Sequence, residues 1–329
     1  MLKVGIVGTG DIAISSHIPK LSATDAVKLV AVADIRKEAA DAVAAKHNVK
    51  AYYDYRDLLA ADVDMIIVCT PPELHVDMGI AAVEAKKHLF IEKPVALDME
   101  GAMRLKEAVD KSGMRCQCGY IIGYWPQSDT LRRVYKSGRL GKLVSLFDAR
   151  IGAVKLPRQA IGTHRDWITK KARSGGVLVE CFTHEIAWMV SVGGKVDSVY
   201  ARMQVTETDS RIDIDDNHWA ILNFAEGGVA TFGGSWANPA DLYGKSIAGQ
   251  DAAAIVCDEG VKIKHRFDEH EEIVPATMDS QVQNMHEDFA ARILDGRPNF
   301  NNLDDAIYNL KVMLAMHKSS QENAVVKVD

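Results

Sequence analysis

The stretch Lys-Val-Gly-Ile-Val-Gly-Thr-Gly-Asp-Ile-Ala, residues 3–13, decides the fold of the first part of the chain. Its first five residues are typical of a short buried strand, and Gly8, Gly10 and Ala13 then form a Gly-x-Gly-x-x-Ala pattern. Gly8 allows a tight turn, Gly10 lets the backbone approach a phosphate, and Ala13 lets helix and strand pack closely. The N–H groups at the start of the helix would face an anion. The stretch therefore predicts a parallel α/β sheet with a phosphate site.

The next apolar strand, residues 28–33, ends in Asp34 and indicates what the phosphate belongs to. Asp34 follows Gly10 at roughly the 20-residue offset at which a carboxylate binds ribose hydroxyls, so we expect a dinucleotide. A carboxylate would repel the 2′-phosphate of NADP, which favours NAD. Arg36 could instead pair with that phosphate, or it could be a solvated residue that opens the next helix. We therefore expect NAD, with NADP as the alternative.

The segment Glu92-Lys93-Pro94 follows an apolar run at residues 88–91 that is typical of a buried strand. Lys93 would emerge at the carboxyl end of this strand, where open α/β sheets hold their ligands. The alternative is a surface lysine in a turn. Cys69-Thr70-Pro71 ends another buried run in the same way, and His75 opens the helix after it. The residues that we expect to contact the cofactor are Gly8, Thr9, Gly10, Asp11, Ile12, Asp34, Arg36, Cys69, Thr70, Pro71, His75, Glu92 and Lys93.

The 329 residues are enough for two domains, and the pattern of the chain changes near residue 120. Strand and helix periods alternate over residues 1–120, which predicts a Rossmann-type, doubly wound parallel sheet of about six strands. Strands dominate residues 121–329, which predicts an α+β domain with one large, mostly antiparallel open sheet. We expect closing helices at residues 280–294 and 304–319, the last of which could pack back on the first domain.

Composition excludes several classes of protein. The net charge is −6 with a pI near 6.0 and there is no basic block, so a nucleic-acid partner is not expected. No apolar stretch approaches the ~20 residues that span a bilayer, and a strand begins almost at Met1, which leaves no room for a signal peptide. The five cysteines form no Cys-x-x-Cys pair and their number is odd, so we expect reduced thiols, no metal and a cytoplasmic protein.

A second group of candidate residues lies between residues 161 and 188. Glu180 and His184 are four residues apart on a helix predicted over residues 176–192, so both side chains would project from one face and reach the same ligand. The alternatives are a solvated helix pair and a hydrogen-bonded structural histidine. The spacing alone does not decide between these interpretations.

These motifs together resemble the glucose-fructose oxidoreductase, inositol dehydrogenase and rhizopine-catabolism family, written Gfo/Idh/MocA, over nearly the full length of the chain. The Gly8 fingerprint, the Thr70-Pro71 loop, Glu92-Lys93-Pro94 and the Glu180/His184 pair occur in the family's order. The family often has Asp where this chain has Glu180, and another Asp where this chain has Ala187. The role of the acid is therefore open.

Substrate recognition is the second departure from the family pattern. The family commonly has two basic residues shortly after an aromatic residue near position 120, whereas this chain has Tyr-Ile-Ile-Gly-Tyr-Trp-Pro at residues 120–126. An aromatic pocket suits a sugar ring better than a free carboxylate, although two of these aromatic residues could equally be core residues. Besides Lys93, Glu180 and His184, the residues that we expect to contact the substrate are Tyr120, Tyr124, Trp125, His164, Arg165 and Trp167.

The resemblance implies an NAD-dependent dehydrogenase that acts on a secondary hydroxyl of a sugar, inositol or related polyol. In this interpretation His184 takes the hydroxyl proton, Lys93 stabilises the developing alkoxide, and Glu180 orients His184 or a substrate hydroxyl. Two alternatives stay open: an NAD-dependent glycosidase with no net redox change, and a regulator that binds the dinucleotide without catalysis. The resemblance also implies a homodimer or homotetramer that pairs through an open sheet face, on which we expect Val199, Leu222 and Phe232.

Overall fold

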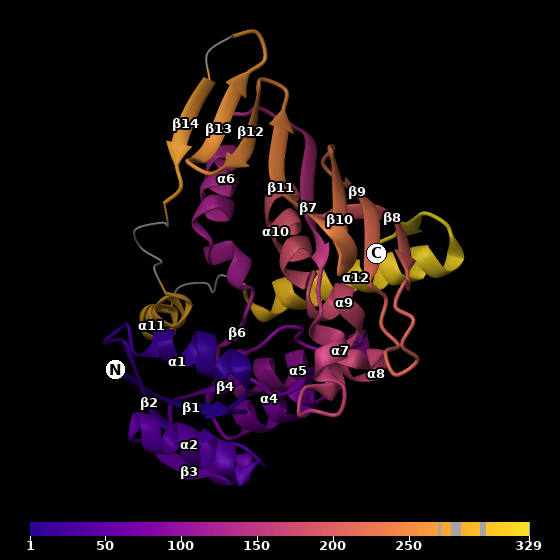
Figure 1. Ribbon diagram of the computed structural model, residues 1–329. Coiled ribbons are helices and arrows are strands. Elements are labelled where there is room, and N and C mark those ends of the chain that lie inside the picture. The colour runs from indigo at the N-terminus through magenta and orange to yellow at the C-terminus, as the bar shows by residue number, and fades with distance from the viewer. Residues whose placement is uncertain (269–270, 278–283, 297–300, 329) are drawn as a thin grey trace. The chain divides into compact units, whose positions relative to one another are not determined.

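The computed structural model describes residues 1–268, 271–277, 284–296 and 301–328, and the chain divides into two compact units (Figure 1). Unit 1 comprises Met1–Tyr120 and Gln281–Ile307, and unit 2 comprises Ile121–Ser280 and Tyr308–Asp329. The predicted division into domains at residues 1–120 and 121–329 stays a prediction. None of the helices in the described ranges combines the length and the apolar character that crossing a membrane requires.

Unit 1 is built on a parallel sheet whose described residues form six strands in the order β3-β2-β1-β4-β5-β6. The strand order reverses between β1 and β4, which is the point where open α/β sheets bind their ligands. This is the predicted doubly wound sheet. The strands are β1 (Leu2–Val7), β2 (Val27–Ala33), β3 (Lys50–Tyr52), β4 (Met65–Val68), β5 (His88–Ile91) and β6 (Cys116–Cys118).

The helices of unit 1 connect these strands. The helix after the glycine fingerprint opens with a π-helical segment, η1, and continues as α1. Residues 280–283 of the first predicted closing helix lie outside the described residues, and the described helix there is α11. The helices are η1 (Ala13–His17), α1 (Ile18–Leu21), α2 (Lys37–His47), α3 (Tyr55–Leu59), η2 (Pro72–Leu74), α4 (His75–Glu84), α5 (Met99–Ser112) and α11 (Met285–Asp295).

Unit 2 contains a large sheet whose described residues form nine strands in the order β14-β13-β12-β11-β7-β10-β9-β8-β15. Its neighbouring strands are antiparallel except β10 and β7, which run parallel. The predicted large, mostly antiparallel sheet is therefore confirmed. The strands are β7 (Leu143–Ala153), β8 (Val196–Gln204), β9 (Asn217–Phe224), β10 (Val229–Ser235), β11 (Ala237–Gly249), β12 (Ala252–Cys257), β13 (Gly260–His265), β14 (Glu271–Pro275) and β15 (Val326–Lys327).

Helices cover one face of this sheet. The side chain of Trp188 on α10 donates to the carbonyl of Ser128 on α6 at 3.0 Å, and Ser319 on α12 accepts from the Ala201 N–H of β8 at 2.9 Å. Other short helices follow β7. The helices are η3 (Ile121–Tyr124), α6 (Pro126–Lys136), α7 (Leu156–Ala160), η4 (Asp166–Thr169), α8 (Lys171–Ser174), α9 (Gly176–Glu180), α10 (Thr183–Gly193) and α12 (Leu303–Glu322), of which α12 spans the boundary between the units.

The open face of the large sheet does not carry the residues that we expected. Val199, Leu222 and Phe232 are at most 2% exposed, so their assignment to the open face is wrong. The residues next to them in sequence point the other way, because side chains alternate along a strand. Residues paired across the sheet share a face, and this register places Ile221, Thr231, Phe147, Ser246 and Ile255 in one row on the open side.

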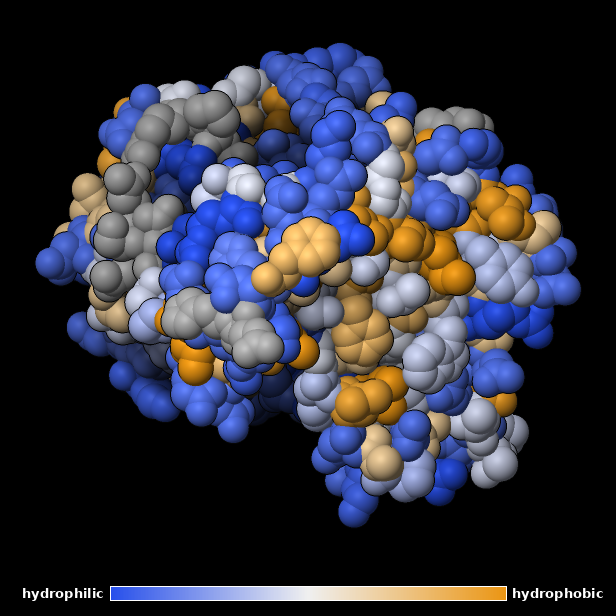
Figure 2. Space-filling view, turned by 90° about the horizontal axis from the view of Figure 1, so that it is seen from above, coloured by the Kyte–Doolittle hydropathy of each residue, from blue (hydrophilic) through white to orange (hydrophobic). Residues whose placement is uncertain are grey.

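Large apolar side chains of that row are exposed to solvent. Phe147, Ile221 and Ile255 are 39%, 43% and 50% exposed, and Trp219, two residues before Ile221, is 48% exposed. The space-filling view from above shows apolar side chains, in orange, gathered over part of one surface among hydrophilic ones (Figure 2). The open face therefore carries apolar side chains, as expected. They belong to the residues that alternate with Val199, Leu222 and Phe232 along the strands.

Candidate functional site

The glycine fingerprint forms a turn that only glycine fits. Gly8 has a φ of +92°, and a Cβ there would lie 2.7 Å from the carbonyl oxygen of Cys69 at the end of β4. The N–H of Gly8 donates to the carbonyl of Ala33 at 2.8 Å, which ties the turn to β2 as well. A Cβ at Gly10 would meet no atom within 4 Å. The backbone at Gly10 therefore faces open space, which fits a loop that a pyrophosphate approaches.

Asp34 is held in place at the end of β2 by the fingerprint loop. Its Oδ2 accepts from the backbone N–H of Thr9 at 2.9 Å and from the Thr9 hydroxyl at 2.8 Å. Arg36 donates to Oδ1 through its backbone N–H at 2.9 Å and pairs with Oδ2 through Nη2 at 3.2 Å. Burial alone would raise the pKa of Asp34, but the bonds from Arg36 and Thr9 outweigh it and lower the pKa. Asp34 is thus an ordered carboxylate, which fits the ribose of NAD.

His75 ties the Thr-Pro loop to the segment that carries Lys93. Its Nε2 lies 2.8 Å from the carbonyl oxygen of Thr70, and its Nδ1 lies 2.7 Å from that of Pro94. The ring is 1% exposed, and burial lowers its pKa against the effect of the two carbonyls. A neutral imidazole has one N–H and can donate to only one of these carbonyls. His75 therefore lies between the two loops and donates to the carbonyl of one of them.

Lys93 leaves the sheet beside these loops. Glu92 is 7% exposed, its Oε2 accepts from the N–H of Lys93 at 3.2 Å, and the Lys93–Pro94 peptide bond is cis. Strands β1, β4 and β5 are parallel neighbours, so the fingerprint turn, the Thr70 loop and Lys93 meet along one edge of the sheet, at the carboxyl ends of its strands. Asp11 and Ile12 are exposed at the start of the helix there, and Cys69 is buried. The sequence-predicted cofactor residues thus share this edge within unit 1.

The predicted helix over residues 176–192 is broken, which corrects the expectation about Glu180 and His184. Helix α9 ends at Glu180 and α10 begins at Thr183. Phe182, at the break, is fully buried and packs edge-on against the rings of Phe232 and His218, at 5.5 and 5.4 Å between centroids. Glu180 and His184 are both partly exposed, but they do not form an i,i+4 pair on one regular helix.

Arg150 of β7 contacts the residues at the break between α9 and α10. Its Nη2 donates to the carbonyl oxygen of Cys181 at 3.1 Å, its Nε lies 3.3 Å from Oε1 of Glu185, and its guanidinium lies 5.2 Å from the centre of the Phe182 ring. Glu185 is 1% exposed. Because these contacts hold residues on both sides of His184, Arg150 fixes the position of the His184 backbone.

A buried ion pair continues this cluster and was missed by sequence reasoning. Lys245 of β11 pairs with Asp148 of β7, and its ammonium lies 4.5 Å from the centre of the Trp188 ring. Burial raises the pKa of Asp148 to about 6, although Lys245 opposes the shift and Glu185 adds to it. The sequence offers one sign of this pair, which is that Asp148 and Arg150 are charged residues two positions apart in a mostly apolar strand. Charges on a helix-covered face must be paired, so such a pattern predicts buried partners.

The predicted substrate residues have different surroundings. Tyr120, which ends the first segment of unit 1, is 2% exposed, and its carbonyl accepts from Asn301 at 3.2 Å. In unit 2, Trp125 precedes α6 and is 44% exposed, whereas Tyr124 is half-buried. His164 is exposed, and Arg165 and Trp167 are half-buried around η4. The exposed indole of Trp125 is therefore not a core residue, and the substrate roles of all six stay predictions.

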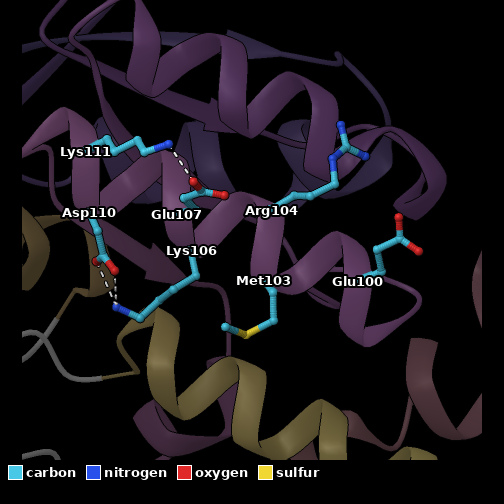
Figure 3. A pocket seen from close by; sticks show the side chains of 7 residues that line it. All are labelled: Glu100, Met103, Arg104, Lys106, Glu107, Asp110 and Lys111. Carbon is cyan, nitrogen blue, oxygen red and sulfur yellow. Dashed lines mark hydrogen bonds and ion pairs between the residues drawn. The ribbon is translucent and has the colours of Figure 1, made fainter.

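A hollow on the surface of α5 carries no candidate chemistry. It is lined by Glu100, Met103, Arg104, Lys106, Glu107, Asp110 and Lys111. Two ion pairs lie within this set, Lys106 with Asp110 at 2.8 Å and Lys111 with Glu107 (Figure 3). These are solvated helix pairs. Within the described ranges, no group of three or more His, Cys, Asp or Glu residues could hold a metal ion.

Two family models match the chain. Residues 2–120 match the oxidoreductase family with an NAD-binding Rossmann fold, and residues 128–261 match the GFO/IDH/MocA C-terminal domain. The chain belongs to the Gfo/Idh/MocA oxidoreductase family. It is an NAD(P)-dependent oxidoreductase whose first unit is an NAD-binding Rossmann domain, so the predicted family, fold class and cofactor are confirmed.

Individual relatives within the family differ in what is known of them. An uncharacterized oxidoreductase, ORF334, of Rhizobium meliloti is 28% identical over 98% of this chain and 97% of its own. The inositol 2-dehydrogenase of Salmonella typhimurium is 32% identical over 60% of this chain and 57% of its own length. The WlbA dehydrogenase of Bordetella pertussis, solved with NADH and UDP-GlcNAcA, has a TM-score of 0.84 and 19% identity over 99% of this chain and 98% of that one, which shows the shared fold.

Proposed function

We propose that this oxidoreductase oxidises a secondary hydroxyl of an inositol, sugar or related polyol, reversibly, with NAD as the oxidant. The observation that carries the proposal is the position of Lys93 at the sheet edge where the Gly8 turn, Asp34 and the Thr70 loop also lie. A cation at that edge would stand next to the reacting part of a dinucleotide bound there. The inositol 2-dehydrogenase relative supports the polyol class.

The residues divide the chemistry between them in this proposal. Bound NAD would supply the hydride acceptor, so that loss of a hydride from carbon and of a proton from oxygen would oxidise the alcohol by two electrons to a carbonyl. His184 removes the hydroxyl proton as general base. Lys93 stabilises the negative charge that develops on the substrate oxygen. Glu180 orients His184 or a substrate hydroxyl.

Features of the chain's own residues support the cofactor site, the roles of Lys93 and His184, and the substrate class. The turn at Gly8 and Gly10 would hold the pyrophosphate, and Asp34 the adenosine ribose. Lys93 and His184 are both partly exposed, as side chains that act on a diffusing substrate must be. The exposed Trp125 could stack on a polyol ring, and Arg165 could replace the cation that the family has near position 120.

A substrate screen tests the proposal. The purified protein is mixed with NAD or NADP and with myo-inositol, scyllo-inositol, a panel of aldoses or an aryl glucoside, and reduced nicotinamide is followed by absorbance. We expect NADH formation with at least one polyol or sugar and little reduction of NADP. Release of the aryl group without net NADH would instead show a glycosidase. Binding of NAD without any turnover across the panel would favour a regulator.

We propose further that the protein forms a homodimer or homotetramer through the open face of the large sheet. The exposed apolar residues Phe147, Trp219, Ile221 and Ile255 support this, because a monomer rarely leaves so many large side chains on one face. Light scattering should give a multiple of 36.1 kDa at micromolar concentration, and Ile221→Lys should shift it toward the monomer. A wild-type protein that scatters as a monomer would contradict this. The cytoplasmic location stays a prediction.

A further inference from the structure

Two buried histidines of unit 1 line up behind Glu92. Nε2 of His17 lies 2.8 Å from Oε1 of Glu92, and Nδ1 of His17 lies 3.0 Å from Nε2 of His286. Both imidazoles are fully buried. Phe90 packs against both rings, at 5.5 Å from His17 and 4.9 Å from His286 between centroids. A hydrogen-bonded row of three polar side chains therefore crosses an aromatic region and ends one residue before Lys93.

The bond directions in this row follow from the chemistry of the imidazole. A carboxylate only accepts, so Nε2 of His17 carries a proton and donates to Glu92. If the His17 ring is neutral, its Nδ1 then accepts from the Nε2–H of His286. Nδ1 of His286 has no hydrogen-bond partner among the described residues, and burial holds the pKa of His286 well below its ordinary value, with His17 and Lys20 adding to the shift. A neutral His286 therefore carries its proton on Nε2, where Nδ1 of His17 accepts it, and the N–H groups of both rings point toward Glu92.

The opposite side of the Glu92 carboxylate is closed by Gly119. A Cβ on Gly119 would lie 2.7 Å from Oε1 and 3.1 Å from the carboxyl carbon of Glu92. The N–H of Gly119 donates to the carbonyl of Ile91 at 2.9 Å, so the glycine cannot easily retreat. The carboxylate is thus confined between His17 and the Gly119 backbone, while its Oε2 accepts the N–H of Lys93.

We propose that His17 and His286 are positioning residues for Lys93. They hold Glu92 as a fixed carboxylate, and Glu92 in turn fixes the backbone from which the Lys93 side chain projects. The sequence places His17 at the end of the π-helical segment that follows the glycine fingerprint, so the same helix that serves the dinucleotide also orders the catalytic lysine. This inference rests on the catalytic role of Lys93 in the proposed function.

Variants at His17 separate positioning from folding. His17→Gln retains an N–H near the position of Nε2, whereas His17→Leu removes the donor to Glu92. With myo-inositol or the best substrate of the screen, His17→Leu should lower kcat by ~10- to 100-fold, because a displacement of about 1 Å at the reacting atoms has an effect of that size. KM and the calorimetric affinity for NAD should change less than threefold, and His17→Gln should recover most of the loss.

A measurement without turnover tests the same geometry. In protein with ¹⁵N-labelled histidine, NMR should show His17 and His286 as neutral rings protonated at Nε2, and His17→Gln should shift the His286 resonances. His88→Gln, at the end of β5 opposite to the end that Glu92 follows, is the matched control and should leave both kcat and these resonances unchanged.

Three results would overturn the inference. One is a full kcat in His17→Leu, and another is an equal loss in His17→Leu and His17→Gln. The third is a His17 ring without a proton at Nε2. If the screen finds no substrate at all, the proposed function fails while the NMR result still decides whether the row of hydrogen bonds exists.

Discussion

The two units hold their candidate residues in different ways. In unit 1, Asp34 and His75 are each fixed by a backbone N–H or carbonyl from a neighbouring loop. In unit 2, the segment that carries Glu180 and His184 is fixed by side chains, through the partly buried Arg150 and the buried Glu185. Backbone contacts of this kind accompany a short sequence motif, whereas a buried ion pair joins residues far apart in the chain. The comparison predicts that mutations in unit 1 mainly change binding and rate, whereas those in unit 2 also change stability.

The largest effect is expected at Lys93. Lys93→Met keeps the length of the side chain but removes its charge and its donors, so kcat should fall by ~10² to 10⁴, the range for removing one acid, base or electrostatic stabiliser. The melting temperature and the NAD affinity should be nearly unchanged. Lys111→Met on the exposed surface of α5 is the control and should keep full turnover. An Lys93→Met protein with near-normal kcat would leave only the cofactor-binding part of the proposal.

The buried ion pair of unit 2 should show the stability effect. Lys245→Met leaves Asp148 buried without its partner, and breaking a buried pair in this way costs about 3–5 kcal/mol of the free energy of unfolding. The double variant Asp148→Leu/Lys245→Met should recover most of it, because an apolar pair needs no desolvation of charge. Urea unfolding measures both. A loss below about 1 kcal/mol in the single variant would mean that the pair is solvated.

Asp34 should control cofactor preference with a smaller effect. Asp34→Ser removes hydrogen bonds to a charged acceptor, which are worth about 1.5–3 kcal/mol each, and also relieves the repulsion of a 2′-phosphate. The ratio of NAD to NADP affinity should therefore fall by at least ~10-fold, as measured by calorimetry. Freed from Asp34, Arg36 could pair with the 2′-phosphate, and Asp34→Ser/Arg36→Gln should remove that gain. An unchanged ratio in Asp34→Ser would show that another residue selects the cofactor.

The smallest effect is a pH dependence from Asp148. Its pKa is about 6 in the folded protein and about 4 in the unfolded chain, so the folded state binds the proton more tightly. The contribution of Asp148 to the free energy of unfolding is therefore fully present below pH 4, and it is lost as the pH rises through 6. Urea unfolding at intervals between pH 4 and 6 should show a steeper fall in wild type than in Asp148→Asn. Equal slopes would contradict the raised pKa of Asp148, because they would mean that the folded and unfolded states bind its proton equally.

The sequence predicts unit 1 well because its strands run in parallel and end in residues with recognisable chemistry. Once β1, β4 and β5 are neighbours, Gly8, Thr70 and Lys93 must meet at one edge. The row His286, His17 and Glu92 could not be predicted in this way, because it joins a residue after the second unit's strands to the first helix. Nothing in the local sequence around His286 indicates that contact.

Unit 2 shows two limits of pattern reasoning. Strand β9 is apolar on both faces at Trp219, Ile221 and Leu222, so its alternation does not say which face the helices cover. The prediction that Leu222 lies on the open side is therefore wrong, and Trp219 and Ile221 are exposed instead. The break between α9 and α10 has no proline or glycine at Cys181 or Phe182. Arg150 of β7 contacts the break through the carbonyl of Cys181, and helix periodicity does not reveal such a tertiary contact.

The central claim is that Lys93 and His184 act on one proton transfer, and a double-mutant cycle tests it most directly. The kcat of Lys93→Met, His184→Ala and the double variant would be measured with the same substrate and saturating NAD. We predict that the double variant is scarcely slower than either single variant, as expected for residues that work as a unit. Fully multiplicative losses would contradict the account, because they would mean that Lys93 and His184 stabilise the reaction independently.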